Sequence, residues 1–201
     1  KRAKFASDDE KKGLLKERAD VIRDKLKDSA RAIQALTEVT SLGVDDALES
    51  LAKTQEEAGD FESAVSTLQK ISDAAADLLI KQNIMLRVAM IQLDKMGDVD
   101  STVLTLRKAR DLNPSSLDVL SLLARAMIAK RNFAEALMIL GQQAELQDNA
   151  SAKGRILASM GAICFDNLGD SDRAMVYYRQ ALAFDESNFD AAFNLLKLYR
   201  Q

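Results

Sequence analysis

The side chains that most often carry catalysis are scarce in this sequence, and their scarcity sets the first bound on its function. The chain of 201 residues has no histidine and a single cysteine, Cys164. Histidine is the side chain whose unperturbed pKa suits acid–base work near neutral pH. Zinc sites and Cys–His nucleophiles need residues that this chain lacks. These reaction classes are therefore excluded.

The carboxylates that remain offer little chemistry. Two adjacent acidic pairs, Asp45-Asp46 and Glu56-Glu57, fall in predicted helices or helix caps, where a solvated face is the simpler interpretation. No phosphate-binding glycine loop, dinucleotide fingerprint or GxSxG hydrolase motif is present in the chain. We expect no enzyme activity, no cofactor and no metal site. Cys164 is predicted to be a small buried apolar side chain.

Composition favours a helical protein throughout. Hydrophobic residues make up 47% of the chain and charged residues 29%, with one proline, eight glycines and no tryptophan. This balance allows a buried core and excludes intrinsic disorder. The net charge of −3 gives no general attraction to nucleic acid or to an anionic membrane. No apolar run reaches the roughly 18 residues of a membrane-spanning helix.

Cysteine usage and the first residue bear on location. A single cysteine cannot form an intrachain disulfide, which fits a reducing compartment, and we expect a cytoplasmic protein. The sequence begins at Lys1 rather than at methionine. We therefore expect it to belong to a larger protein or complex, from which a targeting signal could have been removed.

Four segments share one turn pattern, in which a short break separates two helical stretches. The breaks are Gly59-Asp60, Gly97-Asp98, Arg131-Asn132 and Gly169-Asp170, at successive spacings of 38, 34 and 38 residues. Glycine tolerates the positive φ that ends a helix, and aspartate caps the next one. A small residue follows five positions after the first residue of each break: Ala64, Thr102, Ala136 and Ala174. Such residues let two antiparallel helices approach closely.

These units resemble the tetratricopeptide repeat, a helix–turn–helix of about 34 residues. The match is strongest over LGDSDRAMVYYRQALAFDESN, and Arg110–Pro114 resembles the proline segment that ends a repeat. The resemblance covers roughly residues 45–201. It implies an all-α, right-handed α-solenoid of about four helix–turn–helix repeats in a domain 44–201. The predicted repeats are 45–78, 83–116, 117–150 and 154–188, with a terminal helix at 189–201.

The segment 1–43 is predicted to be a different element, a single long helix. Its acidic start at Asp8-Asp9-Glu10 suits a helix N-terminus, and Gly43 is a suitable stop. Apolar or small residues recur in steps of four and three: Leu15, Ala19, Ile22, Leu26, Ser29, Ile33, Leu36 and Thr40. This heptad pattern indicates a helix that packs on the first repeat or on an adjacent chain's repeats, or one that self-associates.

The terminal helix 189–201 reads as the first helix of a fifth repeat without its second helix. It is either a capping helix that presents Lys197, Arg200 and Gln201 to water, or a truncated repeat. A solenoid needs its last apolar face to be covered.

The resemblance also implies where a partner would bind, because the first helices of such repeats line a concave groove. The candidate contact residues are Glu49, Lys53, Ile84, Arg87, Ile91, Lys95, Ser121, Leu122, Arg125, Ile128 and Arg155. An apolar floor with basic points suits a peptide that carries acidic and apolar groups. Some relatives grip a chaperone's terminal carboxylate with a lysine and asparagines in the first two repeats and a lysine and an arginine in the third. At the matching places this chain has Glu49, Lys53, Val88, Asp118 and Leu122, so a chaperone-tail adaptor is disfavoured.

The sequence therefore predicts a non-enzymatic scaffold or adaptor that binds a partner peptide or helix in the groove. The alternative is a structural module that forms homo-oligomers through the N-terminal helix or the open solenoid end. Nucleic acid is not an expected partner, and no membrane span is expected.

Overall fold

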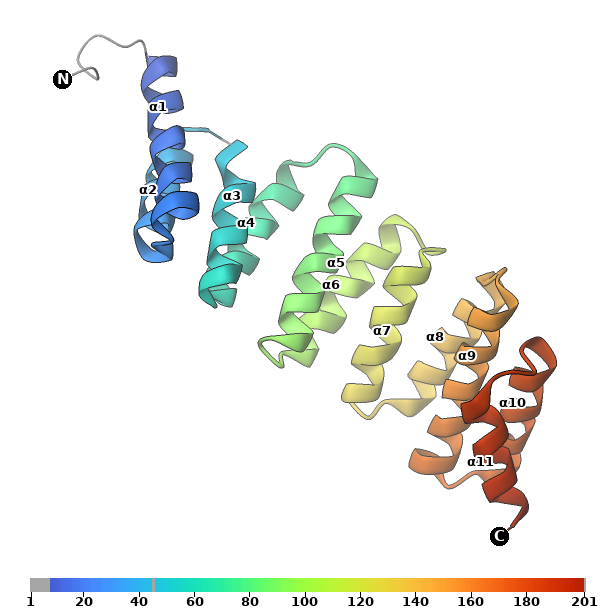
Figure 1. The fold of residues 1–201 in the computed structure, drawn as a ribbon. Coiled ribbons are helices and arrows are strands. Elements are labelled where there is room, and N and C mark those ends of the chain that lie inside the picture. The colour runs from blue at the N-terminus through green and yellow to red at the C-terminus, as the bar shows by residue number, and fades with distance from the viewer. Residues whose placement is uncertain (1–7, 45, 201) are drawn as a thin grey trace. The chain divides into compact units, whose positions relative to one another are not determined.

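In the computed structural model, residues 8–44 and 46–200 are described, and all their regular structure is helical. The chain divides into two compact units, Lys1–Gly97 and Asp98–Gln201. Each unit consists of helices that follow one another in antiparallel pairs (Figure 1). This is the all-helical, solenoid-type fold that the sequence predicts.

The described residues of unit 1 form six helical elements. They are α1 (Asp8–Val21), its π-helical continuation η2 (Ile22–Leu26), α2 (Ser29–Ser41), α3 (Asp46–Ala58), α4 (Phe61–Ala74) and α5 (Leu78–Asp94). Each α-helix packs against the next one along the chain. Contacts between neighbours in sequence are what a repeat architecture requires.

Seven helical elements make up unit 2 as far as residue 200. They are α6 (Val99–Leu112), α7 (Leu117–Ala129), α8 (Phe133–Leu146), α9 (Ala150–Ala162), the π-helical η3 (Ile163–Asn167), α10 (Ser171–Phe184) and α11 (Phe189–Tyr199). Successive α-helices again pack on one another, and the α9–α10 pair has the most extensive contact.

The four predicted breaks are all confirmed as helix–helix turns. Gly59, Gly97 and Gly169 have φ angles of 79°, 66° and 66°, and Arg131 takes the same left-handed position with φ 60°. The residue after each accepts a hydrogen bond at the N-terminus of the next helix; the four caps are Asp60, Asp98, Asn132 and Asp170. Each cap satisfies a backbone N–H that has no partner within the helix.

The small residues that follow the breaks are all buried. Ala64, Thr102, Ala136 and Ala174 are each 0% exposed. The first helix contributes small residues too, since Gly161 of α9 lies directly against the ring of Tyr178 on α10. The predicted close approach of paired helices is confirmed for α9 and α10.

The prediction of one helix over residues 1–43 is wrong. Lys27 adopts a left-handed conformation with φ 55°, and Asp28 caps α2 by accepting a 3.0 Å hydrogen bond from the Arg31 N–H. The described part of the segment is therefore a helical hairpin of α1–η2 and α2. Lysine carries no sequence signal for a left-handed position, so the heptad pattern runs through the turn without a break.

The hairpin packs on the first predicted repeat. Ala19 of α1, Leu36 of α2 and Leu51 of α3 belong to one buried cluster. The first of the two alternatives for this segment, packing on a repeat, is thus what unit 1 shows. Leu26, which the heptad pattern placed in the seam, is 63% exposed, because the turn at Lys27 carries it away from α3.

Candidate partner-binding site

The predicted contact residues lie on the first helices of the repeats, α3 and α5 in unit 1 and α7 and α9 in unit 2, except Lys95, which is the C-cap of α5. Their side chains differ in exposure. The exposed ones are Glu49, Lys53, Lys95, Ser121, Arg125, Ile128 and Arg155, the half-buried ones are Ile84 and Arg87, and the buried ones are Ile91 and Leu122.

Two residues of the set cannot contact a ligand in this conformation. Ile91 is 6% exposed within the cluster that contains Leu68 and Val88, and Leu122 is 5% exposed on α7. The resemblance placed both residues on the groove face of a first helix. Because α7 packs on both α6 and α8, its buried arc is much wider and includes Leu122. Both residues are core positions rather than groove positions.

The sequence interpretation took Arg87 as a basic group available to a ligand, but the structure pairs it with carboxylates of its own unit. Its guanidinium donates to Glu49 and lies 2.7 Å from Glu56, so it joins α5 to two carboxylates of α3. Although burial opposes the charge, the hydrogen bond and charge of Glu49, together with Glu56, raise the pKa of Arg87. Two carboxylates around one guanidinium leave a local charge of −1. This part of unit 1 is unsuited to an acidic ligand.

On α7 of unit 2 the corresponding residues are exposed. Ser121, Arg125 and Ile128 are exposed and stand at i, i+4 and i+7 on α7, which places them along one stripe. This set, here called the α7 stripe, combines a hydroxyl, a cation and an apolar side chain.

On α9, Arg155 is held by its own unit. It donates to the Ser151 hydroxyl at 3.1 Å, and that hydroxyl donates to Asp185 at 2.7 Å. Hydrogen bonds from Ser187 and from Ser151 lower the pKa of Asp185, and Arg155 adds to the effect. Arg155 therefore remains exposed but is oriented toward the turn after α10.

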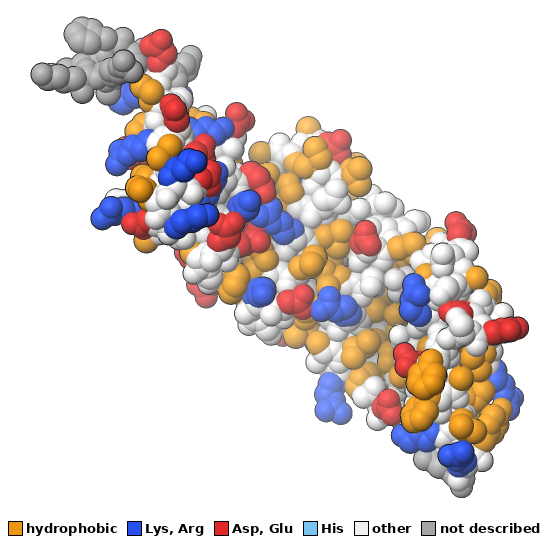
Figure 2. All heavy atoms as spheres, viewed as in Figure 1, with side chains coloured by type: hydrophobic (Ala, Val, Ile, Leu, Met, Phe, Trp, Pro, Cys, Tyr) orange, Lys and Arg blue, Asp and Glu red, His pale blue; other side chains and the backbone are white. Residues whose placement is uncertain are grey.

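The terminal helix α11 presents an apolar surface that the sequence interpretation missed. Phe189, Phe193 and Leu196 are 76%, 57% and 49% exposed. Hydrophobic side chains gather at this end of unit 2 in Figure 2. Lys197 and Arg200 are exposed, as a capping helix requires, and Gln201 lies outside the described residues, but the side of α11 opposite the core also presents these apolar residues. The signal was present in FDAAFNLLKLY, whose apolar residues occupy both sides of a helix.

A second surface that the sequence interpretation missed is a groove between α8 and α10. It has a volume of about 680 Å³ and is lined mainly by apolar side chains, with Glu145 and Arg173 among its polar members. Met138, Gly141, Met160, Leu168 and Tyr177 also line it. The groove lies on the second helices of the repeats, where the sequence offered no periodicity to single it out.

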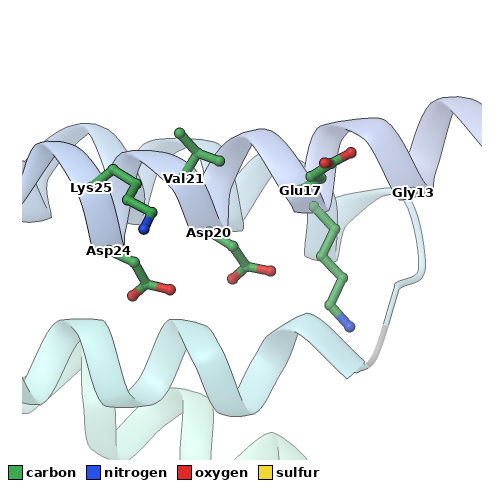
Figure 3. A pocket seen from close by; sticks show the side chains of 7 residues that line it. Gly13, Glu17, Asp20, Val21, Asp24 and Lys25 are labelled. Carbon is green, nitrogen blue, oxygen red and sulfur yellow. The ribbon is translucent and has the colours of Figure 1, made fainter.

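The N-terminal hairpin has a smaller cleft of about 340 Å³ with a charged lining. Asp20 and Asp24 point from α1 and η2 toward α3, whereas Val21 points away (Figure 3). Lys16 lies 3.9 Å from Asp46 at the start of α3, and the hydrogen bond from Arg23 lowers the pKa of Asp24. These opposite charges serve the packing of the hairpin on α3.

Buried polar groups add no chemistry to these surfaces. Cys164 is 0% exposed, as predicted, and burial raises the pKa of its thiol, which keeps it protonated and unreactive at neutral pH. Within the described ranges, no cluster of His, Cys, Asp and Glu could hold a metal ion. No helix among the described residues has the length and apolar character to cross a membrane.

Comparisons with known proteins agree with this geometry. Residues 46–77 and 153–188 match models of the tetratricopeptide repeat, and these segments contain the α3–α4 and α9–α10 pairs. No curated protein matches the chain in sequence.

Solved structures show the same fold at low identity. YrrB, described as a TPR protein with an unusual peptide-binding site, is 12% identical with a TM-score of 0.62 over 90% of this chain and 89% of that one. MamA AMB-1 is 17% identical with a TM-score of 0.62, over 92% and 98% of the two chains. MamA from Desulfovibrio magneticus RS-1 is 14% identical with a TM-score of 0.58, over 89% and 97%.

Proposed function

We propose that this chain, in which residues 46–77 and 153–188 match the tetratricopeptide repeat, is a non-enzymatic scaffold that binds a segment of another protein. Repeats of this kind generally serve as protein-interaction modules. A set of packed helices offers a surface that need not become ordered on binding, so less of the interaction energy is lost.

The observation that carries the proposal is the α7 stripe. Ser121, Arg125 and Ile128 are exposed on one face of a helix whose opposite sides are buried on both neighbours. Their spacing matches the i, i+4, i+7 positions through which one helix recognises another or a short peptide. A partner with an acidic group for Arg125 and an apolar side chain for Ile128 suits this stripe.

The alternative location on unit 1 is disfavoured for such a partner. Glu49 and Glu56 already surround Arg87, so an acidic segment would have to displace them. The proposed site is therefore centred on α7, with Arg155 and Ser159 of α9 as further exposed positions on a first helix of the same unit.

The test uses a peptide array and a charge reversal. The wild-type chain and the double variant R125E/I128A are probed on one array of peptides that combine apolar residues with either acidic or basic residues. The matched control is K108E, a charge reversal at an exposed position of the second helix α6. Circular dichroism and denaturant unfolding establish that all three chains are folded.

We expect wild type and K108E to bind acidic, apolar peptides. The double variant R125E/I128A should bind the same peptides at least about ten-fold more weakly, which is the effect of truncating a well-placed interface residue. The proposal fails if the three chains bind the same peptides equally. It also fails if the peptides lost by the double variant are not enriched in acidic residues.

A further inference from the structure

The helix α11 has two apolar faces, and only one of them is used within unit 2. Ala191, Leu195 and Leu198 are buried in the unit, which α11 joins through its packing on α10. Phe189, Phe193 and Leu196 point to the opposite side, because residues in a helix advance by about 100° and the i, i+4, i+7 positions share a face. These three residues are here called the open stripe.

The open stripe is arranged as a compact surface rather than as scattered apolar residues. The rings of Phe189 and Phe193 are stacked, with centroids 6.1 Å apart and planes inclined by 17°. Contiguous exposed aromatic residues mark an interaction surface, since single exposed apolar residues are common but clustered ones are costly in water. The question is which partner covers them.

The charges beside the stripe indicate its partner. Asp190 lies in the first turn of α11 and Lys197 in its last turn, and their spacing of seven positions puts both on the same edge of the stripe. In an antiparallel pair of identical helices, equivalent edges face each other. Asp190 of one copy then meets Lys197 of the other, and two-fold symmetry produces this ion pair twice. In a parallel two-fold pair, equivalent edges lie on opposite sides of the pair, so Asp190 of one copy would not meet Lys197 of the other.

We propose that two copies of this chain associate through α11, with their helices antiparallel and their open stripes face to face. This association goes beyond the binding of a partner segment on α7, and neither depends on the other. A single helix pair covers less surface than the roughly 1,000 Å² of a stable interface, so the dimer is weak and forms with increasing concentration. A second copy is favoured over an unrelated helix because Asp190 and Lys197 of one copy are complementary to Lys197 and Asp190 of the other.

The decisive experiment is a charge swap across the dimer axis. Sedimentation equilibrium at low ionic strength gives the dimer dissociation constant of wild type, D190K, K197D and the double variant D190K/K197D. Each single variant turns both ion pairs into like-charge contacts, so we expect roughly ten-fold weaker dimers. The double variant restores both pairs with their signs exchanged and should regain wild-type affinity. An equimolar mixture of the single variants should associate more tightly than either alone.

Two further variants separate the interface from the stability of the helix. F193E places a charge at the centre of the open stripe and should abolish the dimer. D172K removes an exposed acidic residue from the first turn of α10, as D190K does for α11, and should leave the dimer intact. Circular dichroism confirms that each variant is folded.

Three outcomes overturn the proposal. In the first, the wild-type chain stays monomeric up to about 1 mM, the range of the weakest specific contacts, which would leave the stripe to a following helix or to another protein. In the second, a dimer forms but survives F193E, so that it uses another surface. In the third, D190K/K197D dimerises as poorly as the single variants, which excludes antiparallel pairing of α11.

Discussion

At the scale of single residues, two glycines of unit 2 allow α9 to pack closely on α10. A Cβ atom built on Gly161 would lie 2.7 Å from Cε1 and 2.8 Å from Cδ1 of Tyr178. About two helical turns before Gly161, a Cβ atom built on Gly154 would lie 3.0 Å from Cβ of Asp185. Both glycines lie on α9 against α10, so their role is steric and not conformational. They set how closely this pair of helices packs.

The substitution Gly161→Ala tests this contact. The Tyr178 ring is 1% exposed and enclosed on all sides, so it cannot move aside without disturbing the core. We expect a loss of about 1–3 kcal/mol in the free energy of unfolding, the usual cost of overpacking. The matched control is Gly141→Ala in α8 of the same unit, where the nearest atom is the flexible end of Met160 at 4.0 Å. Urea unfolding followed by circular dichroism should show no loss for the control; equal effects would refute the steric account.

Tyr178 also makes a pH dependence predictable. Its hydroxyl is buried without a hydrogen-bond partner among the described residues. Burial, together with the charges of Asp166 and Cys164, raises its pKa to about 12, whereas an unfolded tyrosine ionises near pH 10. Between these values the unfolded chain binds fewer protons than the native chain, so stability falls as pH rises from about 10 to about 12.

The substitution Tyr178→Phe should remove this alkaline loss. At neutral pH the variant should be as stable as wild type or slightly more so, because a buried hydroxyl without a partner is costly. Above pH 10 the wild-type chain should lose up to about 1.4 kcal/mol per pH unit relative to the variant. Paired denaturant curves at pH 8 and pH 11 measure the difference. Parallel behaviour of the two chains would show that the hydroxyl is hydrated in the native state.

At the scale of elements, helix boundaries were predictable wherever backbone conformation and residue type are tied together. Glycine at a positive φ and aspartate or asparagine at an N-cap mark a turn by their own chemistry, so the turns at Gly59, Gly97 and Gly169 could be predicted from the sequence. Arg131 could be placed only by its phase with the others. Lys27 lies outside the predicted repeats, so no regular spacing indicated a turn there, and the turn was missed.

The faces of the helices were harder to predict than their ends. A first helix of a repeat packs on two neighbours, so one apolar periodicity does not define which arc stays exposed. This is why Leu122 was taken for a groove residue. The ion pairs of Arg87 join α3 to α5 over 38 residues of sequence, and no local pattern contains such a contact. Exposure of the α11 stripe likewise depends on which side packs against α10.

The substitution Lys27→Gly should change the stability of the chain in opposite directions in the hairpin of α1–η2 and α2 and in a continuous helix. In the hairpin, Lys27→Gly relieves a left-handed lysine and should stabilise the chain by about 1 kcal/mol. In a continuous helix the same glycine would be interior and would cost about 1 kcal/mol. Thermal and urea unfolding of the full chain give the sign. The control, Arg31→Gly inside α2, should be destabilising in either structure.

At the scale of the whole molecule, the two units and their sequential contacts determine how a local change spreads. Repeat proteins are stabilised by terms within each helix pair and between adjacent pairs. Every described helix within a unit packs mainly on its neighbours in sequence. A perturbation should therefore weaken with distance along the chain, and hydrogen exchange reports the stability of each helix separately.

Gly161→Ala allows this expectation to be tested, because its effect originates at one known contact. Hydrogen exchange read by mass spectrometry should accelerate most in α9 and α10, which contain the glycine and the Tyr178 ring. It should accelerate less in α11 and α8, which adjoin that pair, and should not change in α1–α4, which belong to the other unit. A loss of about 2 kcal/mol corresponds to roughly thirty-fold faster exchange wherever the opening involves that contact. The same acceleration in α1–α4 would mean that the chain opens as one cooperative body, since only a global transition carries a local steric cost to every helix.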